Sequence, residues 1–176
     1  GYVPVTTYSA HWIRDPALRR AVARYLEDER RAVAETAQVL ADLGQSRSAV
    51  KSLTTGLTSA ENNQSRAAIH FRRGELYLDS QQFQKAVDDF QRAFELQPSR
   101  ADISHRLGKA QRSLALEELA AGIPEGNARI QQALVAFDRA IASQPDFAEA
   151  LSDRASLHAD LGDMEKAKQD LTKALS

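Results

Sequence analysis

Small and bulky apolar residues recur along this chain in one order: a small residue, a bulky apolar residue four positions later, and another small residue three positions after that. Two copies also place proline twelve positions after the first small residue. These copies are Ala86, Phe90, Ala93, Pro98 and Ala133, Phe137, Ala140, Pro145. Two weaker copies flank them, namely Ala49, Leu53, Gly56 and Ala167, Leu171, Ala174. Internal repetition of this kind predicts stacked units that bury a continuous core.

In three of the four copies, another small residue stands twelve positions earlier. The pairs are Ala37 with Ala49, Gly74 with Ala86, and Ala155 with Ala167. We expect each unit to consist of two antiparallel helices that cross at these residues, because larger side chains would push the backbones apart. Phe90 and Phe137 then fill the space between paired helices. The prolines are expected to end second helices, and Gly44 and Gly162 to take left-handed turns between helices.

The segment AAIHFRRGELYLDSQQFQKAVDDFQRAFELQPSR, residues 67–100, resembles one complete tetratricopeptide repeat. The positions that carry the resemblance are Gly74, Tyr77, Ala86, Phe90, Ala93 and Pro98. Residues 148–176 resemble a second repeat, 101–147 a third with an insertion, and about 33–63 a degenerate copy. The resemblance implies an all-α fold, a right-handed superhelix of antiparallel helix pairs that binds other proteins. His70 and Arg73 stand where the family usually has large apolar residues, and His158 where tyrosine is typical.

The start of the chain has a different pattern. Residues 1–14 predict an extended arm, and Asp15 followed by Pro16 predicts the start of a long helix that runs to residue 43. The stretch PVTTYSAHWI and the residues after it, within 1–34, resemble the C-terminal end of FemAB-like acyltransferases. That resemblance implies an enzyme whose acyl-donor site lies upstream of Gly1. The alternative is a leader that packs Trp12 on the first helix. The chain begins with glycine and has no leader peptide, so we expect an excised or processed portion of a longer protein.

The middle repeat contains an insertion. Gly108 and Ala133 are 25 residues apart instead of 12, and the 13 extra residues favour helix. Shared between two helices, they would lengthen each by roughly 10 Å. Gly122 and Pro124 mark the tip, where Ile123 is expected to be exposed. The extension is either a tolerated elaboration or an added docking surface.

In tetratricopeptide repeats, the first helix of each pair lines the concave groove. The resemblance places these residues there: Phe71, Arg72, Glu75, Leu78, His105, Arg106, Lys109 and Arg112. The centre of this groove is basic, while Glu149, Asp153 and Asp160 make the last repeat acidic. We expect it to bind an extended, acidic peptide or protein partner, because arginine donates paired hydrogen bonds to carboxylates. The alternative is that these charges pair with one another on a solvated face.

Composition narrows the functional classes. The formal net charge of −1 gives no general attraction to nucleic acid or to anionic membranes, and no apolar run approaches the ~20 residues of a membrane span. The absence of cysteine excludes disulfides, thiol catalysis and cysteine-bound zinc, and leaves the compartment open. We expect no cofactor and no catalytic residue, since phosphate-binding loops, HExxH and nucleophile motifs are missing. His70 and His105 lack a third partner that would predict a metal site.

A further alternative concerns the last helix. Leu171, Ala174 and Leu175 stand at the end of the sequence without the polar capping helix that repeat arrays generally carry. In that alternative the array is an oligomeric scaffold, and this helix pairs with another protomer.

Overall fold

The computed structural model describes residues 16, 31, 33, 45–60 and 62–175. Seven helices and no strands are traced in these residues: α2 (Ser46–Ser59), α3 (Asn63–Asp79), α4 (Phe83–Leu96), α5 (Ala101–Ala120), α6 (Glu125–Ser143), α7 (Ala148–Asp160) and α8 (Met164–Ala174). The predicted all-α class is confirmed for this part of the chain. The predicted arm over 1–14 lies outside the described residues, as does the predicted helix over 15–43 apart from three positions.

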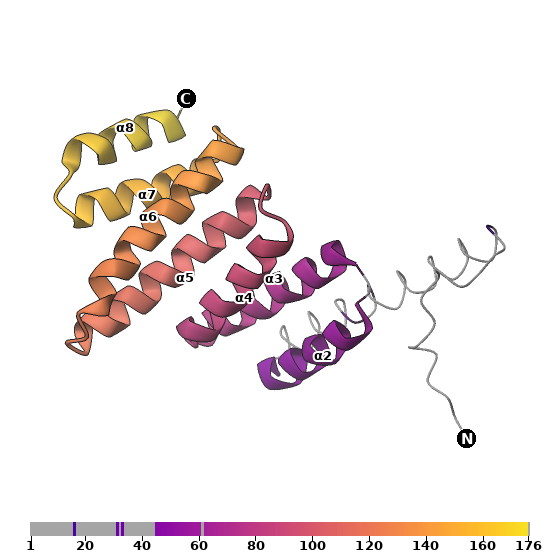
Figure 1. Ribbon diagram of the computed structural model, residues 1–176. Helices are drawn as coiled ribbons and strands as arrows, with labels where there is room; N and C mark the ends of the chain where they lie inside the picture. The colour runs from indigo at the N-terminus through magenta and orange to yellow at the C-terminus, as the bar shows by residue number, and fades with distance from the viewer. Residues whose placement is uncertain (1–15, 17–30, 32, 34–44, 61, 176) are drawn as a thin grey trace, which may run out of the picture.

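Consecutive helices pack as antiparallel pairs, α3 with α4, α5 with α6, and α7 with α8 (Figure 1). The pairs stack in chain order, so that α4 packs against α5 and α6 against α7. Helix α2 packs against α3 and occupies the place of a second helix in a preceding pair. The colour in Figure 1 therefore changes steadily along the stack from α2 to α8.

A glycine and a phenylalanine meet where the helices of a pair cross. Phe90 and Phe137 are fully buried. A Cβ atom added at Gly74 would lie 2.9 Å from Phe90 Cε1, and one added at Gly108 would lie 2.7 Å from Phe137 Cε1. Both distances are too short for carbon atoms, so the rings occupy space that any larger residue would take. The prediction of small residues at the crossings is confirmed here.

The helix ends follow the expected chemistry. Helix α4 ends at Leu96 and α6 at Ser143, each two residues before its proline. Gly162, between α7 and α8, has a φ of 83°, which confirms the left-handed turn predicted for it. At the same position between α3 and α4 stands Gln81, with a φ of 58°. Gly44 lies outside the described residues.

The α5–α6 hairpin is the longest pair in the described part, with helices of 20 and 19 residues. Near its tip a Cβ atom on Gly126 would lie 2.8 Å from the Ala115 carbonyl oxygen, so the two backbones are in direct contact there. Leu116, Leu119 and Ile123 are exposed at this end. None of the helices traced between residues 46 and 174 is long and apolar enough to cross a bilayer.

Candidate functional site

The first helices α3 and α5 meet through one shared carboxylate. Arg72 Nη1 donates a hydrogen bond of 3.0 Å to Glu75 Oε2 on the same helix. From α5, Arg106 Nη2 lies 3.4 Å from Glu75 Oε1. The side chains of Arg72 and Arg106 are 54% and 38% exposed. Two solvent-facing arginines from successive repeats therefore share Glu75.

A second carboxylate joins α5 to α7. His105 Nε2 lies 2.7 Å from Asp153 Oδ2, and Lys109 Nζ lies 4.0 Å from the same oxygen. The imidazole is buried and meets the Phe147 ring edge-on at a centroid distance of 4.9 Å. Burial alone raises the pKa of Asp153, but the hydrogen bond with His105 and the positive charge of Lys109 outweigh it. The pKa of Asp153 is therefore below its usual value, and the group is ionised at neutral pH.

Arg112 makes the next contact between α5 and α7. Its Nη2 donates to Asp160 Oδ2 at 2.6 Å and to Ser156 Oγ at 3.1 Å. Arg106, Lys109 and Arg112 are spaced three residues apart, which keeps them on one side of α5. Together with Arg72, Glu75, Asp153 and Asp160 they form a row of alternating charges across α3, α5 and α7, called the charge ladder below.

The apolar members of the expected groove, Phe71 and Leu78, are half-buried and pack against the core. Phe71 and Leu78 pack against the cluster that contains Phe90. The Phe71 ring meets Phe90 edge-on at 5.7 Å, and the guanidinium of Arg100 lies 5.2 Å from its centroid. His105 is buried. The structure thus brings the charged members together on the surface, while Phe71 and Leu78 keep one side in contact with the core.

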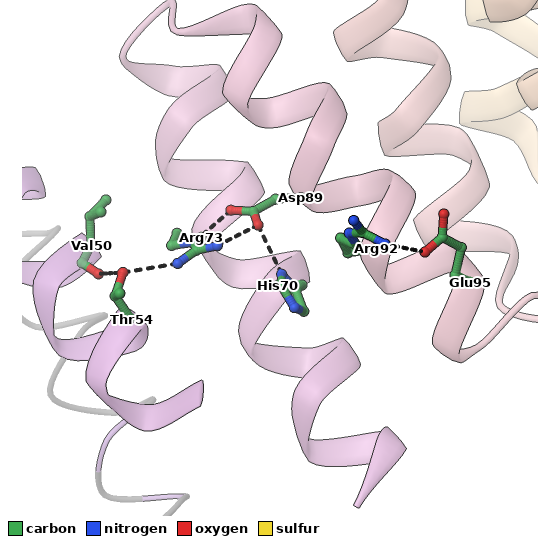
Figure 2. A network of polar contacts seen from close by, with 7 residues as sticks. All are labelled: Val50, Thr54, His70, Arg73, Asp89, Arg92 and Glu95. Carbon is green, nitrogen blue, oxygen red and sulfur yellow. Dashed lines mark hydrogen bonds and ion pairs between the residues drawn. The ribbon is translucent and has the colours of Figure 1, made fainter. Parts of the chain in front are cut away.

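A second polar cluster, which the sequence pattern does not predict, lies partly buried between α3 and α4. Arg73 Nε and Nη2 donate to the two oxygens of Asp89 at 2.6 and 2.7 Å, and His70 Nδ1 lies 2.8 Å from Asp89 Oδ1. Arg73 Nη1 also donates to Thr54 Oγ1 on α2 at 2.9 Å (Figure 2). One arginine therefore connects three helices, and we call this arrangement the arginine clamp.

The clamp is ionic. Burial alone raises the pKa of Asp89, but hydrogen bonds from Arg73 and His70 outweigh it, and the pKa lies below its usual value. The hydrogen bond with Asp89 raises the pKa of Arg73 in turn. The sequence contains a signal that could have predicted this pair. Asp89 directly precedes the inward-facing Phe90, and it stands 16 residues after Arg73.

The last repeat contains the same clamp at the same positions. Arg154 Nε and Nη2 donate to Asp170 at 2.7 and 2.5 Å, and the two residues are again 16 apart. Arg154 Nη1 donates to Asp138 Oδ1 on α6 at 2.6 Å, as Arg73 does to α2. The hydrogen bond with Asp170 raises the pKa of Arg154.

The middle pair has apolar residues at the corresponding positions. Leu107 directly precedes the crossing residue Gly108, as Arg73 precedes Gly74. Ala136 corresponds to Asp89 on the second helix. Leu107 and Ala136 are buried in one apolar cluster. The α3–α4 and α7–α8 pairs thus have an arginine clamp beside the crossing, and the middle pair has apolar residues there.

His70 and His105, which stand on neighbouring first helices, do not contact one another through a shared partner. His70 and His105 are each bonded to a different carboxylate, on α4 and α7 respectively. Among the residues that the structure describes, no three histidine or carboxylate side chains are arranged to hold a metal ion.

Comparison with protein families gives three matches. Residues 67–100 and residues 125–175 match two models of the tetratricopeptide repeat. Residues 1–48 match the FemAB-like family, described as peptidoglycan biosynthesis/recognition. Both resemblances found in the sequence are therefore confirmed. No curated protein sequence matches the chain.

Solved structures share the fold at low sequence identity. MamA from Desulfovibrio magneticus RS-1 has a TM-score of 0.66 and 18% identity, over 87% of this chain and 77% of that chain. TTC0263, a thermophilic TPR protein of Thermus thermophilus, has a TM-score of 0.67 and 20% identity, over 83% and 73%. The human IFIT1 dimer with PPP-AAAA has a TM-score of 0.72 and 20% identity, over 89% of this chain and 34% of that chain. The fold is a tetratricopeptide-like α-solenoid, and the chain carries tetratricopeptide repeats within residues 67–100 and 125–175.

Proposed function

We propose that this chain is a protein-interaction scaffold that binds an extended acidic segment of a partner along the charge ladder. The tetratricopeptide repeats support the scaffold role. The observation that carries the finer proposal is the row of cations on α5, whose carboxylate partners all come from the neighbouring first helices α3 and α7.

The ladder contains two loosely held cations. The Arg106–Glu75 pair at 3.4 Å and the Lys109–Asp153 pair at 4.0 Å are its longest ion pairs. Exposed ion pairs contribute only about 0–1 kcal/mol to stability. Arg106 and Lys109 can therefore turn from Glu75 and Asp153 to an incoming carboxylate at small cost, while Asp153 keeps its contact with His105. The arginine fork can hold that carboxylate with two hydrogen bonds. We assign recognition of the partner to Arg106 and Lys109.

The rest of the ladder has a supporting role. Arg112 is more buried and is bonded to Asp160 at 2.6 Å, so it positions α7 against α5. Arg72 is the most exposed of the four cations and extends the row onto α3. A partner segment that runs from α3 to α7 would meet Arg72, Arg106 and Lys109 in turn.

Charge reversal tests this proposal. The probe is a fluorescent peptide of alternating glutamate and alanine, followed by fluorescence anisotropy at physiological salt. We expect the Arg106→Glu/Lys109→Glu variant to bind it about tenfold more weakly or worse, because two attractive contacts become repulsive. Thermal melting shows whether the variant is folded.

A matched control has the same change of charge on second helices. Arg92 on α4 and Lys168 on α8 are exposed, and Arg92→Glu/Lys168→Glu should leave the affinity within about twofold of the wild type. Unchanged binding by the folded ladder variant contradicts the proposal, and so does an equal loss in the control.

A second candidate rests on the FemAB-like match to residues 1–48. We propose that the full-length protein is an acyltransferase and that the repeats are an interaction module attached to its C-terminal side. Intact mass measurement of the protein isolated from its source tests this. A native protein with a whole domain upstream of Gly1 supports the candidate, and a native N-terminus within a few residues of Gly1 rejects it. The oligomeric alternative stays a prediction.

A further inference from the structure

A cavity of about 300 Å³ lies between α6, α7 and α8, away from the charge ladder. Its walls include Leu134, Asp138, Arg154, His158, Lys166 and Asp170. It therefore lies directly beside the arginine clamp of the last repeat. The 67–100 repeat suggests what this cavity binds, because its corresponding position holds a larger side chain.

In the 67–100 repeat, the position of His158 is held by Tyr77. The Tyr77 ring packs against the core and lies beside two cations. Arg73 Cζ is 6.0 Å from the ring centroid, and Lys85 Nζ is 5.5 Å from it. The electron-rich face of an aromatic ring attracts cations at such distances.

The last repeat keeps both cations and changes the ring. Arg154 precedes the crossing residue Ala155 as Arg73 precedes Gly74, and Lys166 is the counterpart of Lys85 at the start of the second helix. His158 has a smaller ring than tyrosine and carries no phenol group. From this we infer that the cavity is a binding pocket for an aromatic side chain of a partner protein. The partner's ring lies between Arg154 and Lys166, as the Tyr77 ring lies between Arg73 and Lys85.

The hydrogen bonds of Arg154 favour an aromatic ligand over an anion. Asp170 and Asp138 engage the edges of the guanidinium, which fixes the group and leaves its flat face for stacking. The same two carboxylates would repel a carboxylate or phosphate that entered the cavity. Leu134 supplies an apolar wall.

Lys166 provides the movable side of the pocket. It is 61% exposed, and its ammonium is bonded to Asp163 at 2.7 Å on the solvent side. A surface ion pair of this kind is weak, so the lysine is able to turn over a ring that has entered. The pocket thus combines one fixed cation with one adjustable cation.

The test uses p-cresol, which is the tyrosine side chain alone, followed by ¹H–¹⁵N NMR on the full chain. We expect saturable shifts of the Arg154 Nε–H signal and of nearby α7 and α8 amides. The variant His158→Tyr fills the pocket from within, and we expect it to bind p-cresol about tenfold more weakly or worse. Unchanged binding by His158→Tyr overturns the inference, as does the absence of saturable shifts in the wild type.

Two controls separate the sources of binding. 4-Methylcyclohexanol has nearly the same shape without the aromatic face, and acetate carries only a negative charge. Equal affinity for the alcohol, or the same shifts with acetate, overturns the aromatic assignment. The reverse variant Tyr77→His should open a second pocket and give new shifts around Arg73. If it does not fold, the comparison with His158→Tyr decides alone.

Discussion

The α3–α4 and α5–α6 pairs cross through the same two residue types, glycine and phenylalanine, but the residues packed beside the crossing differ. In both, a glycine on the first helix admits a phenylalanine from the second. Beside the crossing, α3–α4 holds an ion pair between the half-buried Arg73 and the buried Asp89, whereas α5–α6 buries Leu107 and Ala136. The comparison teaches that the same glycine–phenylalanine crossing can have either an ion pair or two apolar residues beside it.

The ion pair and the apolar pair affect the stability of the fold in different ways. A buried ion pair and a well-packed apolar pair are often similar in stability, because desolvation offsets the attraction between the charges. The ion pair is nevertheless more sensitive to the loss of one partner. It also gains contacts with the preceding helix, through Thr54 in one repeat and Asp138 in the other. The apolar pair meets the preceding helix through packing instead, because Leu107 and Ala136 share a core cluster with Val87 and Phe90 of α4.

The largest expected effect comes from breaking the clamp on one side. Asp89→Ala removes the carboxylate partner of the half-buried Arg73, which keeps only its hydrogen bond with Thr54, so we expect the free energy of unfolding to fall by about 2–3 kcal/mol. Urea denaturation measures this. Asp88→Ala removes an exposed carboxylate one residue away and should change it by no more than about 0.5 kcal/mol. Similar losses for the two variants would contradict the assignment of Asp89 as a buried ionic partner.

The second largest loss of stability is expected from a larger residue at the glycine–phenylalanine crossing. Gly108→Ala places a methyl group against the Phe137 ring, and overpacking of this kind costs about 1–3 kcal/mol. The same measurement on Gly108→Ala/Phe137→Leu separates steric conflict from helix propensity. If the clash is the cause, the two losses are less than additive, because the leucine makes room for the methyl group. Strict additivity would count against a steric role for Gly108.

The smallest effect on stability is expected when the ion pair is replaced by the apolar residues of the middle pair. Arg73→Leu/Asp89→Ala copies the residues of the middle pair into α3–α4. We expect its free energy of unfolding at pH 7 to lie within about 1 kcal/mol of the wild type, because no charge is left buried alone. A loss as large as that of Asp89→Ala would show that the two environments are not equivalent.

The same double variant changes the response to acid. The pKa of Asp89 is lowered in the folded protein, so its stabilisation is present above the usual value of 3.8 and is lost as the pH falls through the folded pKa. The variant has no such group. Its melting temperature should therefore fall less steeply than that of the wild type below about pH 4. Parallel profiles would mean that Asp89 does not contribute to acid unfolding.

The fold could be predicted because its determinants are local or periodic. Gly74, Phe90 and the prolines mark crossings and helix ends at fixed spacings, and the structure places them accordingly. The pairing of charges could not be predicted in the same way. Whether Lys109 meets Asp153 depends on how two repeats are offset when they stack, and this offset is set by packing between distant segments.

Two features of the site depend on contacts between helices. His70 and Arg73 depart from the apolar pattern of the repeat, and their partner Asp89 stands on another helix. Phe71 is placed in the groove by its position in the repeat, and in the structure its half-buried ring also packs on Phe90 beside Arg100. A single position in a repeat predicts which helix a residue occupies, but its burial also depends on the side chains that cover it.

The shared carboxylates Glu75 and Asp153 have a mechanical consequence. Each forms an ion pair with the first helix of the next or preceding repeat, so these ion pairs help to set the spacing of α3, α5 and α7. Extension of the solenoid by pulling on its ends would lengthen the 3.4 and 4.0 Å contacts before it disturbed the glycine and phenylalanine crossings. The curvature of the array is therefore softer than the helix pairs from which it is built, and ionic strength is a means of adjusting it.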